Sequence, residues 1–196
     1  MKVFIGIQGG KGSFNEEACR YFCKVNDIKN YEIRYLYTTE KVLKNLHRGN
    51  IDYGQFAIED PCGGIVNESI EALTKYTCKI VDKFKYPIRH ALILQKDAKM
   101  DEVKTIMTHP QIYKQCEKTI KQKYNRVDIK FGKGNLIDQA KVAEKISSGD
   151  IEKDTAVIGS KLLTDIYPNL KVEQNNLQDI HEIYTTFIFC KRRYIV

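Results

Sequence analysis

The chain passes from an apolar run into a helical pattern within Thr108-His109-Pro110-Gln111-Ile112-Tyr113-Lys114-Gln115-Cys116. The preceding run, Val103 to Met107, predicts a short strand. Pro110 suits the first position of a helix, because its missing N–H would have no partner there. Thr108 or His109 would then cap a helix end whose free N–H groups and dipole carry positive potential. The junction therefore predicts a strand followed by a helix. Its corner either suits a small oxygen-rich anion, or is an ordinary helix cap beside the solvated side chains of Gln111 and Gln115.

The same alternation of strand and helix extends in both directions along the chain. We predict strands at 3–7, 31–37, 51–58, 78–84, 88–94, 103–107, 127–131, 155–159, 170–173 and 184–191. Helices are predicted from Ser13, from Thr39, at 67–75, from Pro110, at 136–146 and shortly after Gly159. This order indicates an α/β protein with mixed, mainly parallel sheets and helices on both faces.

A break in the pattern near residues 82–87 predicts a second lobe. Because the last strand follows the second lobe, we expect it to return to the first. Lobe one would then cover about 1–84 plus 181–196, and lobe two about 85–180. Two crossings between lobes would create a hinged cleft, a common place for a small ligand.

Composition narrows the class of protein. With 196 residues, of which 42% are hydrophobic, the chain can bury the core of one large domain or two small lobes. Its apolar runs are too short to span a membrane. The first six residues favour a strand over a signal peptide. We therefore expect a cytoplasmic protein without a membrane partner.

Metal binding and nucleic-acid binding are not expected either. The six cysteines include no Cys-x-x-Cys pair and the four histidines have no ligand spacing, so free thiols in a reducing compartment are the simplest interpretation. The net charge of +7 is spread along the chain and has no accompanying helix-turn-helix or RNA-binding motif. Excess positive charge would still attract an anionic metabolite.

Four polar sets stand at the ends of predicted strands. They are the glycine loop 9–13 with Lys11, the acids Glu59 and Asp60, the Thr108 corner, and residues 185–187. Each set also has a purely structural interpretation. The glycine loop would be an ordinary turn, Glu59 and Asp60 solvated acids, the Thr108 corner a helix cap, and residues 185–187 part of a strand that favours β-branched and aromatic residues. Each could also serve chemistry, since glycine loops offer N–H groups to anions and paired carboxylates act as acid and base.

Taken in order, these sets resemble the catalytic module of the prephenate dehydratase family over nearly the whole chain. The matching stretches are 5–14, 52–66, 87–92, 108–116, 176–179 and 185–187. The most specific is Thr108 to Cys116, which resembles the family's Ser-His-Pro-Gln…Gln-Cys motif. Thr185-Thr186-Phe187 resembles its Thr-Arg-Phe ending.

The resemblance implies a two-lobed enzyme whose lobes are similar to those of type 2 periplasmic binding proteins. It would convert prephenate to phenylpyruvate with loss of water and carbon dioxide, using neither metal nor organic cofactor. Thr185 falls on the family's catalytic threonine. The implied substrate-binding residues are Lys11, Glu59, Asp60, Gly64, Thr108, Gln115, Thr186 and Phe187. A homodimer or homotetramer is implied, and the family's regulatory ACT domain is expected to be absent after Phe187.

Two departures from the family pattern matter. Thr186 stands where the family has an arginine, which removes a bidentate partner for a carboxylate; Lys11, Arg89 or Lys191 would have to replace it. Asp60 stands where the family has an asparagine, and about 6 Å from a substrate carboxylate it would cost about 3 kcal/mol at an effective dielectric near 20. Arogenate dehydratase, prephenate decarboxylase and a non-catalytic anion-binding protein therefore remain alternatives.

Overall fold

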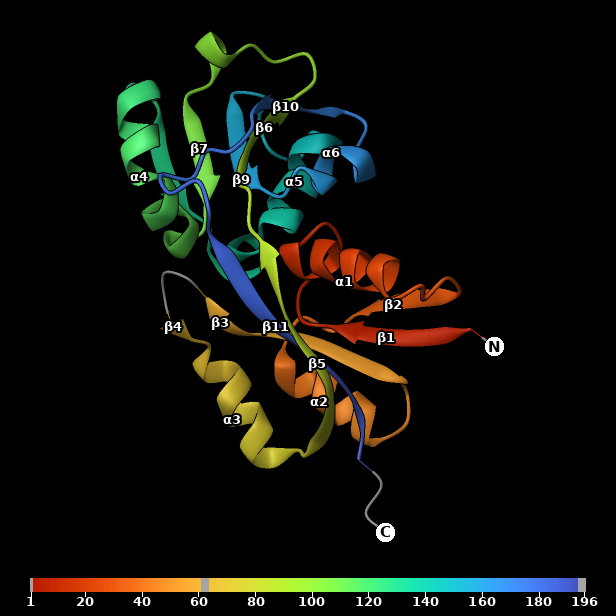
Figure 1. Ribbon diagram of the computed structural model, residues 1–196. Coiled ribbons are helices and arrows are strands. Elements are labelled where there is room, and N and C mark those ends of the chain that lie inside the picture. The colour runs from red at the N-terminus through yellow and green to blue at the C-terminus, as the bar shows by residue number, and fades with distance from the viewer. Residues whose placement is uncertain (1, 61–63, 194–196) are drawn as a thin grey trace. The chain divides into compact units, whose positions relative to one another are not determined.

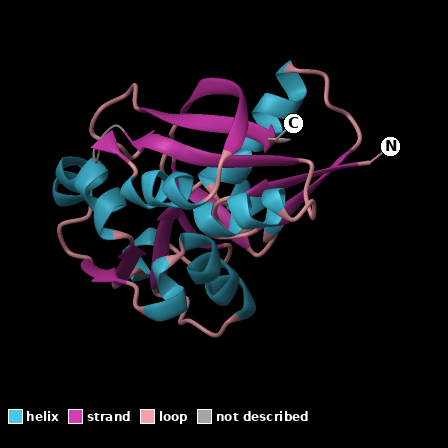
Figure 2. Cartoon of the chain, turned by 90° about the horizontal axis from the view of Figure 1, so that it is seen from below, coloured by secondary structure: helices cyan, strands magenta, loops and turns pink. Residues whose placement is uncertain are grey.

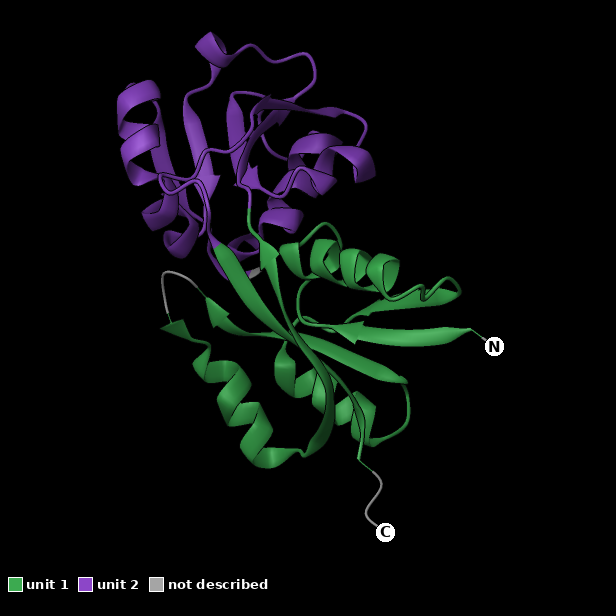
Figure 3. Ribbon diagram, viewed as in Figure 1, with its two compact units in different colours: residues 1–88, 184–196 green, residues 89–183 purple. Residues whose placement is uncertain are grey.

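A computed structural model describes residues 2–60 and 64–193 of the chain. Pro61, Cys62 and Gly63, which belong to the stretch 52–66 that resembles the family, lie outside the described residues. The chain divides into two compact units, drawn in green and purple in Figure 3. Unit 1 holds Met1–Ile88 and Tyr184–Val196, and unit 2 holds Arg89–Ile183.

Unit 1 is a mixed sheet with helices on both faces (Figure 1). Its elements are β1 (Val3–Ile7), α1 (Phe14–Val25), β2 (Tyr31–Tyr35), α2 (Thr39–His47), β3 (Tyr53–Asp60), β4 (Gly64–Ile65), α3 (Asn67–Lys75), β5 (Cys78–Pro87) and β11 (Tyr184–Arg192). The strand order is β2-β1-β3-β11-β5, and β4 pairs with β3. β1 is parallel to β2 and β3, whereas β11 is antiparallel to both of its neighbours.

The two faces of this sheet bury separate clusters. One face packs against α1, where Cys19 and Phe22 join Phe189 of β11. The opposite face packs against α2 and α3, where Leu43 and Ile188 are buried. Ile188 and Phe189 are consecutive, so the alternation of side chains along a strand serves both cores.

Unit 2 is a second mixed sheet with helices on both faces. Its elements are β6 (Ala91–Gln95), the 3₁₀ helix η1 (Met100–Glu102), β7 (Thr105–Thr108), α4 (Pro110–Lys123), β8 (Asp128–Phe131), the 3₁₀ helix η2 (Gly134–Ile137), α5 (Gln139–Ser148), β9 (Thr155–Gly159), α6 (Leu162–Ile166) and β10 (Leu170–Gln174). The order is β10-β6-β9-β7-β8, with β7 parallel to β8 and β9 and the other pairs antiparallel.

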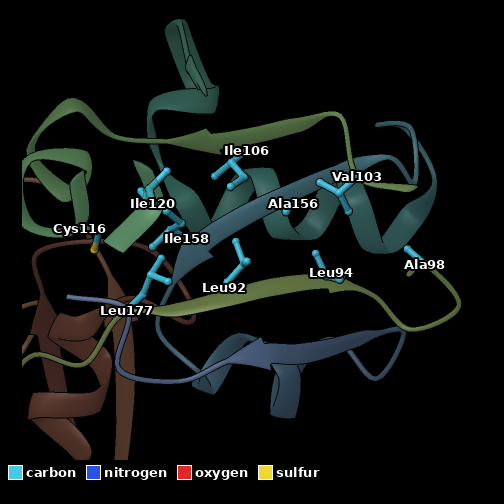
Figure 4. Packing of buried hydrophobic residues seen from close by; sticks show 10 residues of the cluster. All are labelled: Leu92, Leu94, Ala98, Val103, Ile106, Cys116, Ile120, Ala156, Ile158 and Leu177. Atoms are coloured by element: carbon cyan, nitrogen blue, oxygen red, sulfur yellow. The ribbon is translucent and has the colours of Figure 1, made fainter. Parts of the chain in front are cut away.

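The core of unit 2 also has two halves. Figure 4 shows the half beneath α4, in which Leu92, Ile106 and Ile158 from three strands meet Ile120 of the helix. The other half lies beneath α5 and α6 and includes Ile146 and Leu163. Helices and strands alternate along most of the chain. Figure 2 shows them in cyan and magenta. Among the described helices, none combines the length and apolar character required to cross a membrane.

The predicted α/β class with mixed sheets is confirmed, and the antiparallel share is larger than the sequence suggests. Much of that share comes from β11, which lies between β3 and β5. The chain leaves unit 1 at the end of β5 and re-enters it at the start of β11. Because it leaves by one strand and returns by its neighbour, the two strands run in opposite directions.

Candidate active site

The glycine loop before α1 is fixed by a buried carboxylate. Glu16 is fully buried and accepts hydrogen bonds from the Gly12 N–H at 2.7 Å, from Arg20 at 2.7 and 2.9 Å, and from the Tyr35 hydroxyl at 2.9 Å. Burial, reinforced by the nearby charge of Glu16, raises the pKa of Tyr35. A helix begins after Ser13 as predicted, and the Ser13 side chain caps it by accepting a hydrogen bond from the Glu16 N–H. The Glu16 carboxylate accepts from the Gly12 N–H.

This loop presents Lys11 to solvent. Gly9 has φ +104°, and a Cβ there would lie 2.8 Å from the Ser13 hydroxyl, so the turn requires glycine. Lys11 is exposed and forms no ion pair with a described residue. The loop is therefore a rigid support for one accessible cation.

The predicted acids and threonines of unit 1 meet across three neighbouring strands. Thr186 of β11 is opposite Glu59 of β3, and its hydroxyl donates to Glu59 Oε2 at 3.2 Å. The next residue, Asp60, is half-buried and pairs with Gly64 of β4, whose φ of +66° suits glycine. The structure thus brings Glu59, Asp60, Gly64 and Thr186 to one end of β3.

Thr185 differs from its neighbour in the hydrogen bonding of its side chain. Its side chain is buried, at 6% exposed, yet its hydroxyl forms no hydrogen bond with any residue in the described ranges. As consecutive residues of one strand, Thr185 and Thr186 direct their side chains to opposite faces of the sheet. Thr186 is occupied by Glu59, so Thr185 retains a hydroxyl for a ligand.

A lysine lies beside Thr186, the position at which the family that the sequence resembles has an arginine. Lys85 of β5 is directly opposite Thr186, and it is exposed without an ion pair to a described residue. Lys191 is five residues further along β11, about 16 Å away at 3.3 Å per residue, which excludes it as a direct replacement. Arg89 belongs to unit 2. Sequence reasoning missed Lys85 because only the strand register places it next to Thr186.

Phe187, expected among the substrate-binding residues, has a clear part in the core. It is 1% exposed, and its ring stacks on Phe84 with centroids 5.7 Å apart. The aromatic side chain of Phe187 is therefore explained by its packing on Phe84, which joins β11 to β5.

The Thr108 corner in unit 2 has the predicted local structure. Pro110 begins α4, and the His109 ring accepts a hydrogen bond from the Gln111 N–H at 3.1 Å, so His109 is the cap. Burial lowers the pKa of His109. Thr108 is 2% exposed, and its hydroxyl has no partner among the described residues. Gln111 is exposed, so only one of the two glutamines belongs to the buried corner.

Gln115 is held by a histidine that sequence reasoning left without a role. Gln115 is 8% exposed, and its Oε1 lies 2.6 Å from Nε2 of the buried His90. This contact occupies the amide oxygen and leaves the Gln115 NH₂ as a donor. The backbone N–H of His90 donates to Gln178 Oε1 at 3.0 Å. The corner therefore offers a buried hydroxyl and an oriented amide donor.

Asp179 joins the segment after β10 to the middle of α4. Its carboxylate accepts from the N–H groups of Lys118 and Thr119 at 3.0 and 2.8 Å, and from the Thr119 hydroxyl at 2.9 Å. Its own N–H donates to the Gln115 carbonyl at 2.7 Å. In an uninterrupted helix, those N–H groups would bond to carbonyls four residues earlier. Asp179 therefore fixes the backbone of α4 at Gln115, the residue whose side chain presents the amide donor.

The predicted site residues thus form two groups, each on a firm local scaffold. Unit 1 carries Lys11, Glu59, Asp60, Gly64, Thr185, Thr186 and Phe187, and unit 2 carries Thr108 and Gln115. His90, Gln178 and Asp179 were within motifs matched to the family, and that was their only signal in the sequence. Across residues 2–60 and 64–193, no group of three or more histidine, cysteine or acidic residues could hold a metal ion.

Comparison with known proteins identifies the family. A family model described as prephenate dehydratase matches residues 5–194. The bifunctional chorismate mutase/prephenate dehydratase of Buchnera aphidicola (subsp. Acyrthosiphon pisum) is 29% identical over 184 residues, covering 94% of this chain and 46% of that protein. The chloroplastic arogenate dehydratase/prephenate dehydratase 2 of Arabidopsis thaliana is 23% identical and covers 100% of this chain and 48% of its own length. The chain therefore spans about half the length of the curated relatives it matches.

A solved structure shares the fold. The prephenate dehydratase of Arthrobacter aurescens, determined in complex with L-Phe, aligns with a TM-score of 0.86 at 21% identity. The alignment covers 99% of this chain and 62% of that one. At this identity the likeness concerns the fold alone.

Proposed function

Because the chain belongs to the prephenate dehydratase family, we propose that it converts prephenate to phenylpyruvate in phenylalanine biosynthesis. The reaction breaks the bond between the ring and its hydroxyl group. The ring carboxylate departs as carbon dioxide, and its bonding electrons complete the aromatic ring. The hydroxyl group takes up one proton and leaves as water. Formation of the aromatic ring supplies the driving force, so no metal or organic cofactor is required.

Thr185 is the residue to which we assign catalysis. Its hydroxyl would donate a hydrogen bond to the departing oxygen, on which negative charge develops as the bond breaks. The observation that carries this assignment is that Thr185 is only 6% exposed and its hydroxyl has no hydrogen-bond partner among the described residues. Thr186, already bonded to Glu59, would position the strand instead of the reacting atoms.

Substrate binding is assigned to two donors and two cations. The Thr108 hydroxyl and the Gln115 amide of unit 2 are donors suited to carboxylate oxygens. Lys11 and Lys85 of unit 1 are exposed cations that could neutralise the two carboxylates of prephenate. We further propose that the protein works in the cytoplasm as a homodimer or homotetramer.

A second candidate substrate is arogenate, and Asp60 favours it. Arogenate carries an ammonium group where prephenate carries a keto oxygen. A carboxylate at Asp60 would attract that ammonium, whereas it repels a carboxylate at the same distance. Curated relatives named as arogenate dehydratases are consistent with this alternative.

Two substitutions at Thr185 test the assignment. Thr185→Val keeps the shape of the side chain but removes the hydroxyl, and we expect turnover to fall by about 10²–10³-fold, as for loss of one oxyanion donor. KM should change little, because the lost interaction belongs mainly to the transition state. Thr185→Ser keeps the hydroxyl and should retain most activity. Equal activity of the valine and wild-type proteins would place catalysis on another residue.

A further inference from the structure

Unit 1 contains a cavity at the far end of β11 from the candidate catalytic residues. Its volume is about 790 Å³, and its lining includes Lys79, Lys191, Arg192, Arg193 and a single acid, Asp52. Lys191 lies six residues beyond Thr185 on the same strand, about 20 Å away at the usual rise of a strand. The cavity is therefore separate from the candidate site.

Three of the cations that line this cavity have no ion-pair partner among the described residues. Lys79, Lys191 and Arg193 form no ion pair with any residue of the described ranges. The Asp52 carboxylate already accepts a hydrogen bond from the Phe4 N–H at 2.8 Å. These three cations and one carboxylate leave a net of two positive charges at one concave surface.

The sheet itself forces two of these cations together. Lys191 of β11 is directly opposite Lys79 of β5 in the register. Like charges at directly opposed positions destabilise a sheet. A bound anion would remove that repulsion, so the pairing points to a ligand instead of to surface solvation alone.

We propose that this cavity binds a compact anion with two or more negative charges, of the polyphosphate or polycarboxylate type. Arg193 would provide a planar donor pair that matches the oxygens of either group. Lys79 and Lys191 would neutralise charge from the two strands. The cavity has room for a small molecule, since ligand pockets measure about 300–1,000 Å³.

Isothermal titration at constant ionic strength tests the proposal, with pyrophosphate and citrate as the two probes. We expect at least one probe to bind the wild-type protein at one site per chain. The double variant Lys79→Gln/Lys191→Gln should bind that probe at least tenfold more weakly. The control Lys41→Gln/Lys83→Gln removes the same charge from exposed lysines that do not line the cavity, and it should weaken binding less than threefold.

The relative affinities of the two probes, and a single-site variant, add two further tests. Tighter binding of pyrophosphate would identify a phosphorylated ligand, and tighter binding of citrate a polycarboxylate. Should a double variant fail to fold, Arg193→Gln alone should still weaken binding several-fold. The proposal is overturned if neither probe binds the wild-type protein, if the control loses as much affinity as the cavity variant, or if saturating prephenate displaces the probe.

Discussion

The link between Asp179 and α4 predicts a measurable loss of stability. In Asp179→Ala, the N–H groups of Lys118 and Thr119 and the Thr119 hydroxyl lose their shared acceptor. Each hydrogen bond to a charged group contributes about 1.5–3 kcal/mol, but the carboxylate is partly solvated and water can replace some of the lost contacts. We therefore expect the free energy of unfolding to fall by about 2–3 kcal/mol in total. For a chain of this length, that corresponds to a Tm lower by about 4–12 °C.

The pH dependence supplies a second signature of this contact. Burial raises the pKa of Asp179, but the hydrogen bonds from Lys118 and Thr119 outweigh it and hold the pKa below its usual range. The folded pKa is thus lower than the unfolded value of about 3.9. The stabilisation is then complete above pH of about 4 and is lost as pH falls through the lower folded pKa. Asp179→Asn should lose this part of the acid sensitivity.

Calorimetric unfolding at pH 7 and between about pH 5 and 2 measures both effects. Asp128→Ala is the matched control, because Asp128 is exposed and its side chain forms no bond or ion pair with a described residue. A loss of under about 0.5 kcal/mol in Asp179→Ala, or one equal to the control, would refute the reasoning. So would unchanged acid sensitivity in Asp179→Asn.

Two further predictions concern unit 1. Glu16→Gln keeps the shape of the side chain but weakens its charge-assisted bonds to Arg20 and Gly12; urea unfolding should show a loss of about 2–3 kcal/mol, and an unchanged midpoint would contradict the role given to the network. Lys85→Gln should raise KM for prephenate about tenfold with little change in kcat, because the lysine acts in binding. The Lys83→Gln protein, altered at another exposed lysine of β5, should keep the wild-type KM; equal values for Lys85→Gln and wild type would remove Lys85 from the binding assignment.

Local signals in the sequence predicted the local structure well. Pro110 begins a helix capped at His109, Ser13 caps α1, and the helix expected at 67–75 has those bounds in the structure. These features depend on backbone chemistry within a few residues, which a single sequence records.

Contacts between distant residues could not be predicted in the same way. Lys85 and Thr186 are neighbours only through the register of β5 and β11, which depends on the whole sheet. Asp179 meets α4 sixty residues earlier in the chain, and nothing in its local sequence names that partner. The His90–Gln115 contact likewise requires the folded sheet of unit 2.

Incubation of the purified wild-type chain with prephenate in the presence of a metal chelator tests the central proposal most directly. Phenylpyruvate and carbon dioxide should form in a one-to-one ratio, identified by mass spectrometry and gas capture. Activity should be the same with and without the chelator. Prephenate that binds, as judged by thermal stabilisation, but yields no phenylpyruvate above the rate without protein would contradict the proposed function and favour a non-catalytic anion-binding protein.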